Sequence, residues 1–220
     1  NEIYLDQSGG SGTFTIKQDG STNTLGAVSD RAGLTGNSKT FTSITTGTGN
    51  EILLQETGNS TTTELLITGN TNEVDSNVEG DSNDTTFEIT GNTNTLLVKA
   101  DVAADVENTT NNSNIDVTIE GNTNDVTFSM VDTDAAVNLW SLIGDLNVVN
   151  SYQQGQTGGI GHAQTVELFG SSNNVDIYQI GTEAHTIDLQ VLGSDNDYTI
   201  TQTDGTTPTY TNPSAVTTQP

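Results

Sequence analysis

Glycine recurs along this chain at a fixed step of eleven residues. Six glycines follow this step without a break: Gly36, Gly47, Gly58, Gly69, Gly80 and Gly91. The same step separates Gly9 from Gly20 and Gly170 from Gly181, and Gly193 follows Gly181 at twelve. A fixed period is the signature of a repeat architecture, so we expect stacked copies of one small unit.

The glycines open a short motif of the form Gly-x-x-Asn, as in Gly69–Asn72 and Gly91–Asn94. Glycine and asparagine both tolerate positive φ and are frequent in tight turns. We therefore expect each motif to be a corner of the chain. The repeat glycines, including Gly20 and Gly193, are then structural rather than catalytic residues.

Between corners the sequence alternates apolar and polar residues. The fifth, seventh and ninth residues after Gly58 are Thr63, Leu65 and Ile67, and most other repeats place apolar side chains at the same offsets. A period of two with one apolar face predicts half-buried strands. Two strands and two corners per roughly 22 residues predict an all-β fold, a β-solenoid with two facing sheets.

Three stretches break the rhythm, and we interpret residues 24–35, 95–120 and 148–163 as insertions or irregular coils. Since the rhythm resumes after each, one solenoid domain over residues 1–205 is expected. The segment 206–220 contains all three prolines of the chain, and proline cannot donate to a strand ladder. This segment is predicted to be a tail, a cap or an arm for a partner.

Composition narrows the function. The chain has four basic residues and a formal net charge of −25, which disfavours nucleic acid as a partner and suits a salty or extracellular medium. There is no cysteine for a disulfide or a thiolate metal site, and no apolar run is long enough for membrane insertion. The initiator Met is rarely removed when Asn follows it, so we expect further residues before Asn1 in the full protein. Such a segment would be compatible with export of the protein from the cell.

Residues 18–23, QDGSTN, have the form Gln-x-Gly-x-x-Asn, and Gln7 and Gln179 begin similar motifs two residues before glycines. This motif resembles the curlin repeat of secreted curli fibre subunits, and the opening NEIYLDQSGG is similar to repeats in structural proteins of marine tailed phages. The resemblance implies a β-solenoid with inward Gln and Asn ladders, here Gln7, Gln18, Gln179 and Gln202. Many repeats depart from it and carry Glu56, Ile67, Val78 or Ile89 in place of Gln.

Catalytic motifs are weak in this sequence. His162 and His185 are interpreted as solvated surface residues, since no Gly-x-Ser-x-Gly elbow frames a nucleophile. Two alternatives remain: a solenoid hydrolase that uses a pair of carboxylates, and an adhesin that binds glycans. Rows of threonine suggest ice binding as a further function, because flat solenoid faces with regular threonine arrays bind ice. The positions of these threonines relative to the repeat glycine change from one repeat to the next, which disfavours this function. We expect no enzyme and no catalytic residue.

Calcium is the one cofactor with candidate ligands. Asp75, Glu79, Asp81 and Asp84 lie near one predicted corner and offer the hard oxygen ligands that Ca²⁺ prefers. The Gly-Gly-x-Gly-x-Asp signature of calcium-binding rolls is absent. Solvated turn acids are therefore the preferred interpretation, and no cofactor is expected.

Phe128 and Met130 share a face at strand spacing and are predicted to be core, while Trp140 fits either core packing or an interface anchor. The open ends of a solenoid must be capped or paired. We therefore expect a structural assembly protein, located at a virion surface or outside the cell. Its expected partners are copies of itself and other proteins of a phage virion; the alternative is a secreted curli-like fibre or matrix subunit.

Overall fold

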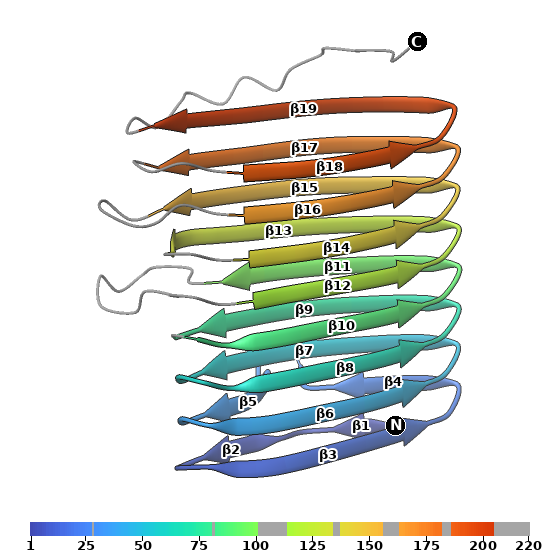
Figure 1. Cartoon of the computed structure of the whole chain (residues 1–220). Helices are drawn as coiled ribbons and strands as arrows, with labels where there is room; N and C mark the ends of the chain where they lie inside the picture. The colour runs from blue at the N-terminus through green and yellow to red at the C-terminus, as the bar shows by residue number, and fades with distance from the viewer. Residues whose placement is uncertain are drawn as a thin grey trace.

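The computed structural model describes residues 1–27, 29–80, 82–100, 114–133, 137–155, 163–181 and 186–204. These residues form an all-β fold without helices, in which parallel strands stack as a β-solenoid of about 23 residues per turn. The fold class expected from the repeat is confirmed. Figure 1 shows the strands rising as a ladder from the N-terminal end to β19, with two sheets lying face to face.

In the described part of the chain the larger sheet has eleven strands and the smaller sheet has eight. The larger sheet contains β1 (Glu2–Ile3), β2 (Asp6–Ser8), β4 (Thr22–Leu25), β5 (Ala32–Thr35), β7 (Gly49–Thr57), β9 (Thr71–Glu79), β11 (Thr93–Ala100), β13 (Thr123–Thr133), β15 (Leu146–Gly155), β17 (Ser172–Gly181) and β19 (Asp195–Asp204). The smaller sheet contains β3 (Gly12–Asp19), β6 (Lys39–Thr46), β8 (Thr62–Thr68), β10 (Asp84–Thr90), β12 (Asn114–Glu120), β14 (Val137–Ile143), β16 (Ala163–Phe169) and β18 (Thr186–Leu192).

Each strand pairs in parallel with the strand one full turn away, so equivalent residues of successive turns lie side by side. In the smaller sheet Leu65 lies opposite Phe87, and in the larger sheet Val74 lies opposite Leu96. Register is firmly fixed because a one-residue slip would turn every apolar side chain outward.

The core is the narrow space between the two sheets. The predicted inward offsets are correct: Thr63, Leu65 and Ile67 are all buried, and so are their equivalents in most turns. Trp140 is fully buried and packs edge-to-face on Phe128, with ring centroids 5.1 Å apart, so it belongs to the core. Every turn adds to one continuous apolar strip, which explains how a chain with 30% hydrophobic residues folds.

Strands occupy much of the three stretches interpreted as insertions. Within 24–35, β4 ends at Leu25 and β5 begins at Ala32, and only the link between them leaves the sheet. Within 95–120 and 148–163, strands β11, β12 and β15 continue the regular stack. The links 101–113 and 156–162 and the tail 206–220 lie outside the described residues.

Arg31 holds the link between β4 and β5 against the outer face of the larger sheet. Its guanidinium forms an ion pair with Asp75 and donates to the Asp75 carbonyl oxygen at 2.9 Å. Leu53 is only 6% exposed although its side chain belongs to the outward set of β7. This link is therefore packed on the solenoid rather than extended into solvent.

Candidate functional site: the glycine corner and the buried amide rows

One corner of the solenoid is a column of glycines, which we call the glycine corner: Gly20, Gly47, Gly69, Gly91, Gly121, Gly144, Gly170 and Gly193. These glycines are not required by positive φ. A Cβ added at Gly91 would instead overlap the carbonyl oxygen of Gly69, one turn away. Glycine is needed here because the backbone of each turn lies directly on the next.

The repeat glycines of the opposite corner meet a second requirement. Gly9, Gly36, Gly58 and Gly80 form this corner and have φ of 109°, 125°, 151° and 113°, values that L-residues with a side chain rarely adopt. A Cβ added at Gly36, Gly58 or Gly80 would also overlap the carbonyl oxygen of the corner glycine one turn away. Gly181 belongs to neither set, since it ends β17 as a buried strand residue.

Asparagine side chains form a hydrogen-bonded column in the core beside the glycine corner. We call this column the asparagine row; it contains Asn1, Asn23, Asn50, Asn72, Asn94, Asn124, Asn147, Asn173 and Asn196. Each Nδ2 donates to the Oδ1 of the next asparagine at 2.7 to 3.1 Å. In several turns the same Nδ2 also donates to a backbone carbonyl, as Asn94 does to Gly91 O at 3.2 Å.

The structure corrects the turn role that the sequence analysis gave to these asparagines. From Asn23 onward they lie within strands, and the non-glycine residues with positive φ in the described ranges are Ser38, Ser60 and Ser82. Extending the alternation one step back, from the fifth to the third residue after glycine, would have placed these asparagines on the inward face. The inward amide ladder implied by the curlin resemblance agrees with this geometry.

A second column of inward residues lies near the opposite corner of the larger sheet. We call it the glutamine row; in register order it contains Gln7, Leu34, Glu56, Val78, Ala100, Met130, Gln153, Gln179 and Gln202. Gln202 Nε2 donates to Gln179 Oε1 at 3.0 Å, and Gln179 Nε2 donates to Gln153 Oε1 at 2.7 Å. Gln153 was not among the expected ladder residues.

Glutamine is thus found at the two ends of this row and not in its middle. Gln7 lies beside Leu34, so no amide continues the ladder there. Gln18 lies in β3 of the smaller sheet, where its Nε2 donates to the Thr24 carbonyl at 3.1 Å. The four expected ladder glutamines therefore occupy two different sheets.

Glu56 is a fully buried carboxyl group within the glutamine row. Thr61 Oγ1 donates to its Oε2 at 3.3 Å, while Oε1 has no hydrogen-bond partner in the described part of the chain. Burial raises the pKa of Glu56 to about 7, against the opposing effect of the nearby hydroxyl groups of Thr63 and Thr61. Glu56 is the one titratable carboxyl buried among the described residues, and it lies in the core rather than at a cleft.

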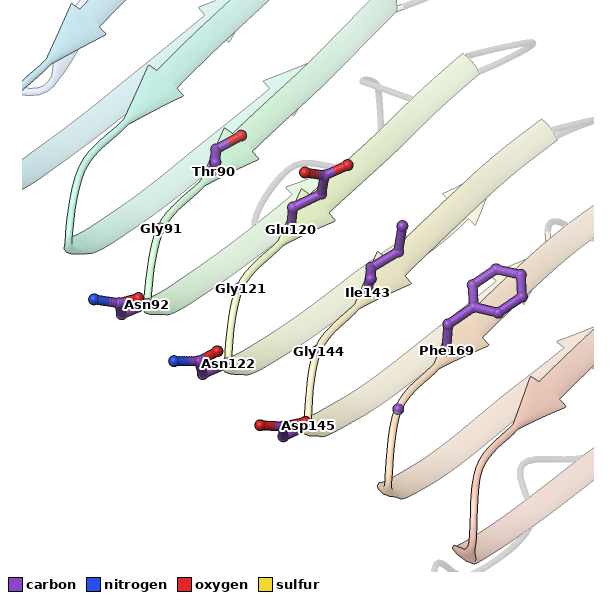
Figure 2. Close-up of a pocket in the computed structure, with 11 residues that line it drawn as sticks. Thr90, Gly91, Asn92, Glu120, Gly121, Asn122, Ile143, Gly144, Asp145 and Phe169 are labelled. Atoms are coloured by element: carbon purple, nitrogen blue, oxygen red, sulfur yellow. The ribbon is translucent and has the colours of Figure 1, made fainter.

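A shallow groove follows the outside of the glycine corner along the solenoid axis. Its floor is glycine, and Figure 2 shows Thr90, Glu120, Ile143 and Phe169 on one side and Asn92, Asn122 and Asp145 on the other. A second stretch, lined by residues from Asp19 to Asn92, shares Thr90, Gly91 and Asn92 with the first and continues the groove toward the N-terminal end.

The wall of this groove changes from polar to apolar along the axis. Thr90 and Glu120 lie in register with Ile143, Phe169 and Leu192 of the later turns. Ile143 is 45% exposed and Leu192 is 62% exposed. Ile143, Phe169 and Leu192 therefore form an apolar strip along the axis at this corner.

The calcium candidates do not gather in the described residues. Asp75 pairs with Arg31, Glu79 accepts a hydrogen bond from Thr57, and Asp84 accepts one from Asn114. In the described ranges no group of three or more His, Cys, Asp or Glu side chains could hold a metal ion. Asp81, His162 and His185 lie outside these ranges.

Comparison of the chain with protein-family models, with curated proteins and with solved structures finds no match. Its class is therefore defined by the fold itself, a two-sheet β-solenoid with buried amide rows. In the part of the chain that the structure describes, no helix has the length and apolar character to cross a membrane.

Proposed function

We propose that this chain is a non-enzymatic structural protein that contributes a rigid β-solenoid to the surface or fibres of a phage virion. The observation that carries the proposal is the asparagine row, which links Asn1 and eight strands of the larger sheet through one continuous series of hydrogen bonds. Such a column stiffens the axis and contributes nothing to a reactive cleft. Shape and rigidity are the properties that it supplies.

The polar groups support a structural role as well. The amides of the asparagine row and of Gln153, Gln179 and Gln202 are used for contacts between turns. The groove along the glycine corner has a floor fixed by the close approach of successive backbones. Its walls change character from turn to turn, whereas a catalytic site would need one fixed set of groups.

A virion is favoured over a secreted bacterial fibre for two reasons. The opening segment resembles repeats of phage structural proteins, and the middle of the glutamine row replaces glutamine with Glu56, Val78, Ala100 and Met130. The secreted curli-like subunit is the second candidate, because Gln153, Gln179 and Gln202 do form a glutamine ladder.

The test is to locate the protein in its native setting. Antibodies against the purified chain would be applied to intact virions and to washed cells from the same culture, followed by gold labelling and electron microscopy. Labelling of virion tails, fibres or capsid surfaces is the expected result. Labelling of cell-attached fibres would replace the proposal with the secreted subunit, and recovery of the protein only as a free solute would overturn a structural role.

A further inference from the structure

Both ends of the described stack expose core residues. At the N-terminal end Ile3, Leu5, Phe14 and Ile16 are only partly buried. At the C-terminal end, formed by β18 and β19, the core residues Ile187, Leu189, Val191 and Tyr198 are partly buried and Ile200 is 42% exposed. Within the described residues each end also presents a strand edge without a neighbouring strand, which is a template for pairing with another strand.

The two end strands of the larger sheet carry the same inward pattern. Register places Asn1, Ile3, Leu5 and Gln7 in the same four columns as Asn196, Tyr198, Ile200 and Gln202. The sequence NEIYLDQ at the start therefore matches NDYTITQ near the end as Asn-x-apolar-x-apolar-x-Gln. The turns between keep the asparagine, but from Leu34 to Met130 they replace the glutamine, and Ser76 replaces one residue of the apolar pair, so the two ends resemble each other more than either resembles the middle.

The asparagine row also has a direction. Every link runs from Nδ2 of one asparagine to Oδ1 of the next toward the C-terminal end, beginning with Asn1 Nδ2 to Asn23 Oδ1 at 2.9 Å. Asn196 accepts from Asn173 at 2.8 Å and donates to Gly193 O at 3.3 Å, but within the described residues it has no following asparagine. Asn1 Oδ1 receives no donor from these residues, so the row ends in a donor at one end and an acceptor at the other.

We propose that a second copy of this chain docks head to tail on the first, with Asn196 Nδ2 donating to Asn1 Oδ1 of the next copy. The inward columns then continue across the junction, with Tyr198 against Ile3 and Ile200 against Leu5. Gln202 comes to lie beside Gln7, which continues the glutamine ladder. This inference deepens the proposed function and rests on it, since it names the partner of a structural protein.

Charge sets the condition for this docking. On the outer face of the junction Asp197 meets Glu2, two like charges on adjacent strands. The solenoid already contains this arrangement, because Glu51 lies opposite Glu73 in neighbouring strands. With a net charge of −25 on each copy, association must overcome repulsion, so docking is expected to strengthen as salt shortens the Debye length.

The test uses the purified 220-residue chain in sedimentation velocity and cryo-electron microscopy at 0.05 M and 1 M NaCl. The expected result is a ladder of multimers at high salt, whose images show one uninterrupted solenoid with the strand repeat of ~4.8 Å continuing across each junction. Chains that remain monomeric at both salt concentrations and at millimolar protein would overturn the proposal.

Two variants probe the junction itself. Asn196→Asp keeps the oxygen that accepts from Asn173 but removes the donor toward the next copy, and should weaken association about tenfold or more. Ile200→Lys places a charge on the end face and should abolish association. Asn174→Asp makes the same chemical change as the first variant on the outer face of β17 and should leave association unchanged.

Circular dichroism and a thermal melt of each variant establish that the monomer is folded. Multimers that form equally well in both junction variants would overturn head-to-tail docking and point to contacts through the sides. This outcome is separate from the localisation test: a solenoid found on virions by antibody labelling but monomeric here would leave the structural role intact and remove only the proposed junction.

Discussion

Asn94 Nδ2 donates to Asn124 Oδ1 at 2.9 Å, although thirty residues separate the two in sequence. The neighbouring link from Asn72 to Asn94 spans 22 residues and has a length of 2.8 Å. Additional residues between turns therefore leave the asparagine row undisturbed. The spacing of the row is therefore set by the stacking of β11 on β13 and not by the number of residues between them.

Replacing Asn94 with alanine should destabilise the solenoid strongly. The change removes hydrogen bonds with Asn72 and Asn124 and leaves a buried donor and a buried acceptor unpaired, at about 1–3 kcal/mol for each group. Guanidinium unfolding followed by circular dichroism measures the loss. Asn92→Ala is the control, because Asn92 is exposed beside the groove and should change the unfolding free energy by less than about 0.5 kcal/mol. Equal effects of the two changes would contradict the role given to the row.

Gly91→Ala tests why the glycine corner is glycine. The new methyl group would overlap the carbonyl oxygen of Gly69 and force two turns apart, so we expect a loss of more than about 3 kcal/mol of unfolding free energy. Gly49→Ala is the matched control, since nothing lies within 4 Å of a Cβ added there. A tolerated Gly91→Ala, judged by an unchanged thermal midpoint, would show that the stacking is looser than described.

Glu56→Gln should stabilise the protein at alkaline pH and have little effect in acid. The folded protein raises the pKa of Glu56 from 4.5 to about 7, so the folded state holds the proton more tightly than the unfolded state. The stability associated with this group is fully present below pH 4.5 and is lost as the pH rises to about 7. The deficit above that pH is roughly 3 kcal/mol by the free energy of one pKa unit.

Thermal melts of both proteins from pH 4 to pH 9 measure this difference. The two curves should converge below about pH 4.5, diverge between pH 4.5 and about 7, and stay apart by a constant amount above that. A constant offset between them at every pH would show that folding does not change the pKa of Glu56. Glu64→Gln, at an exposed position of β8, controls for the loss of one negative charge.

Trp140 should report the integrity of the core. It is the single tryptophan of the chain, it is fully buried against Phe128, and its Nε1 has no hydrogen-bond partner. We expect blue-shifted fluorescence that moves to the red on unfolding. Trp140→Ala should cost about 3–5 kcal/mol, as for large buried aromatic residues, and Trp140→Phe much less because it also removes the unpaired N–H. Fluorescence already red-shifted in the native protein would place Trp140 in water.

Much of this architecture could be predicted from local pattern. The eleven-residue step located the corners, and the alternation at Thr63, Leu65 and Ile67 identified the inward face. The Gly-x-x-Asn motif predicts Asn72 as a turn residue because asparagine is frequent in turns, whereas the structure buries it in β9. Its position followed from the same alternation, so the information was present but the residue type was given more weight than the period.

The sequence by itself determined that this chain forms strands and corners at a fixed period, because glycine freedom and period-two alternation act within a few residues. Only the tertiary structure decided what these residues do once the turns stack. Asn94 meets Asn124, a Cβ at Gly91 meets Gly69, and Glu56 loses its water, each through contacts between residues a full turn apart. Hydrogen bonding, steric exclusion and desolvation depend on these neighbours, and the neighbours exist only in the assembled solenoid.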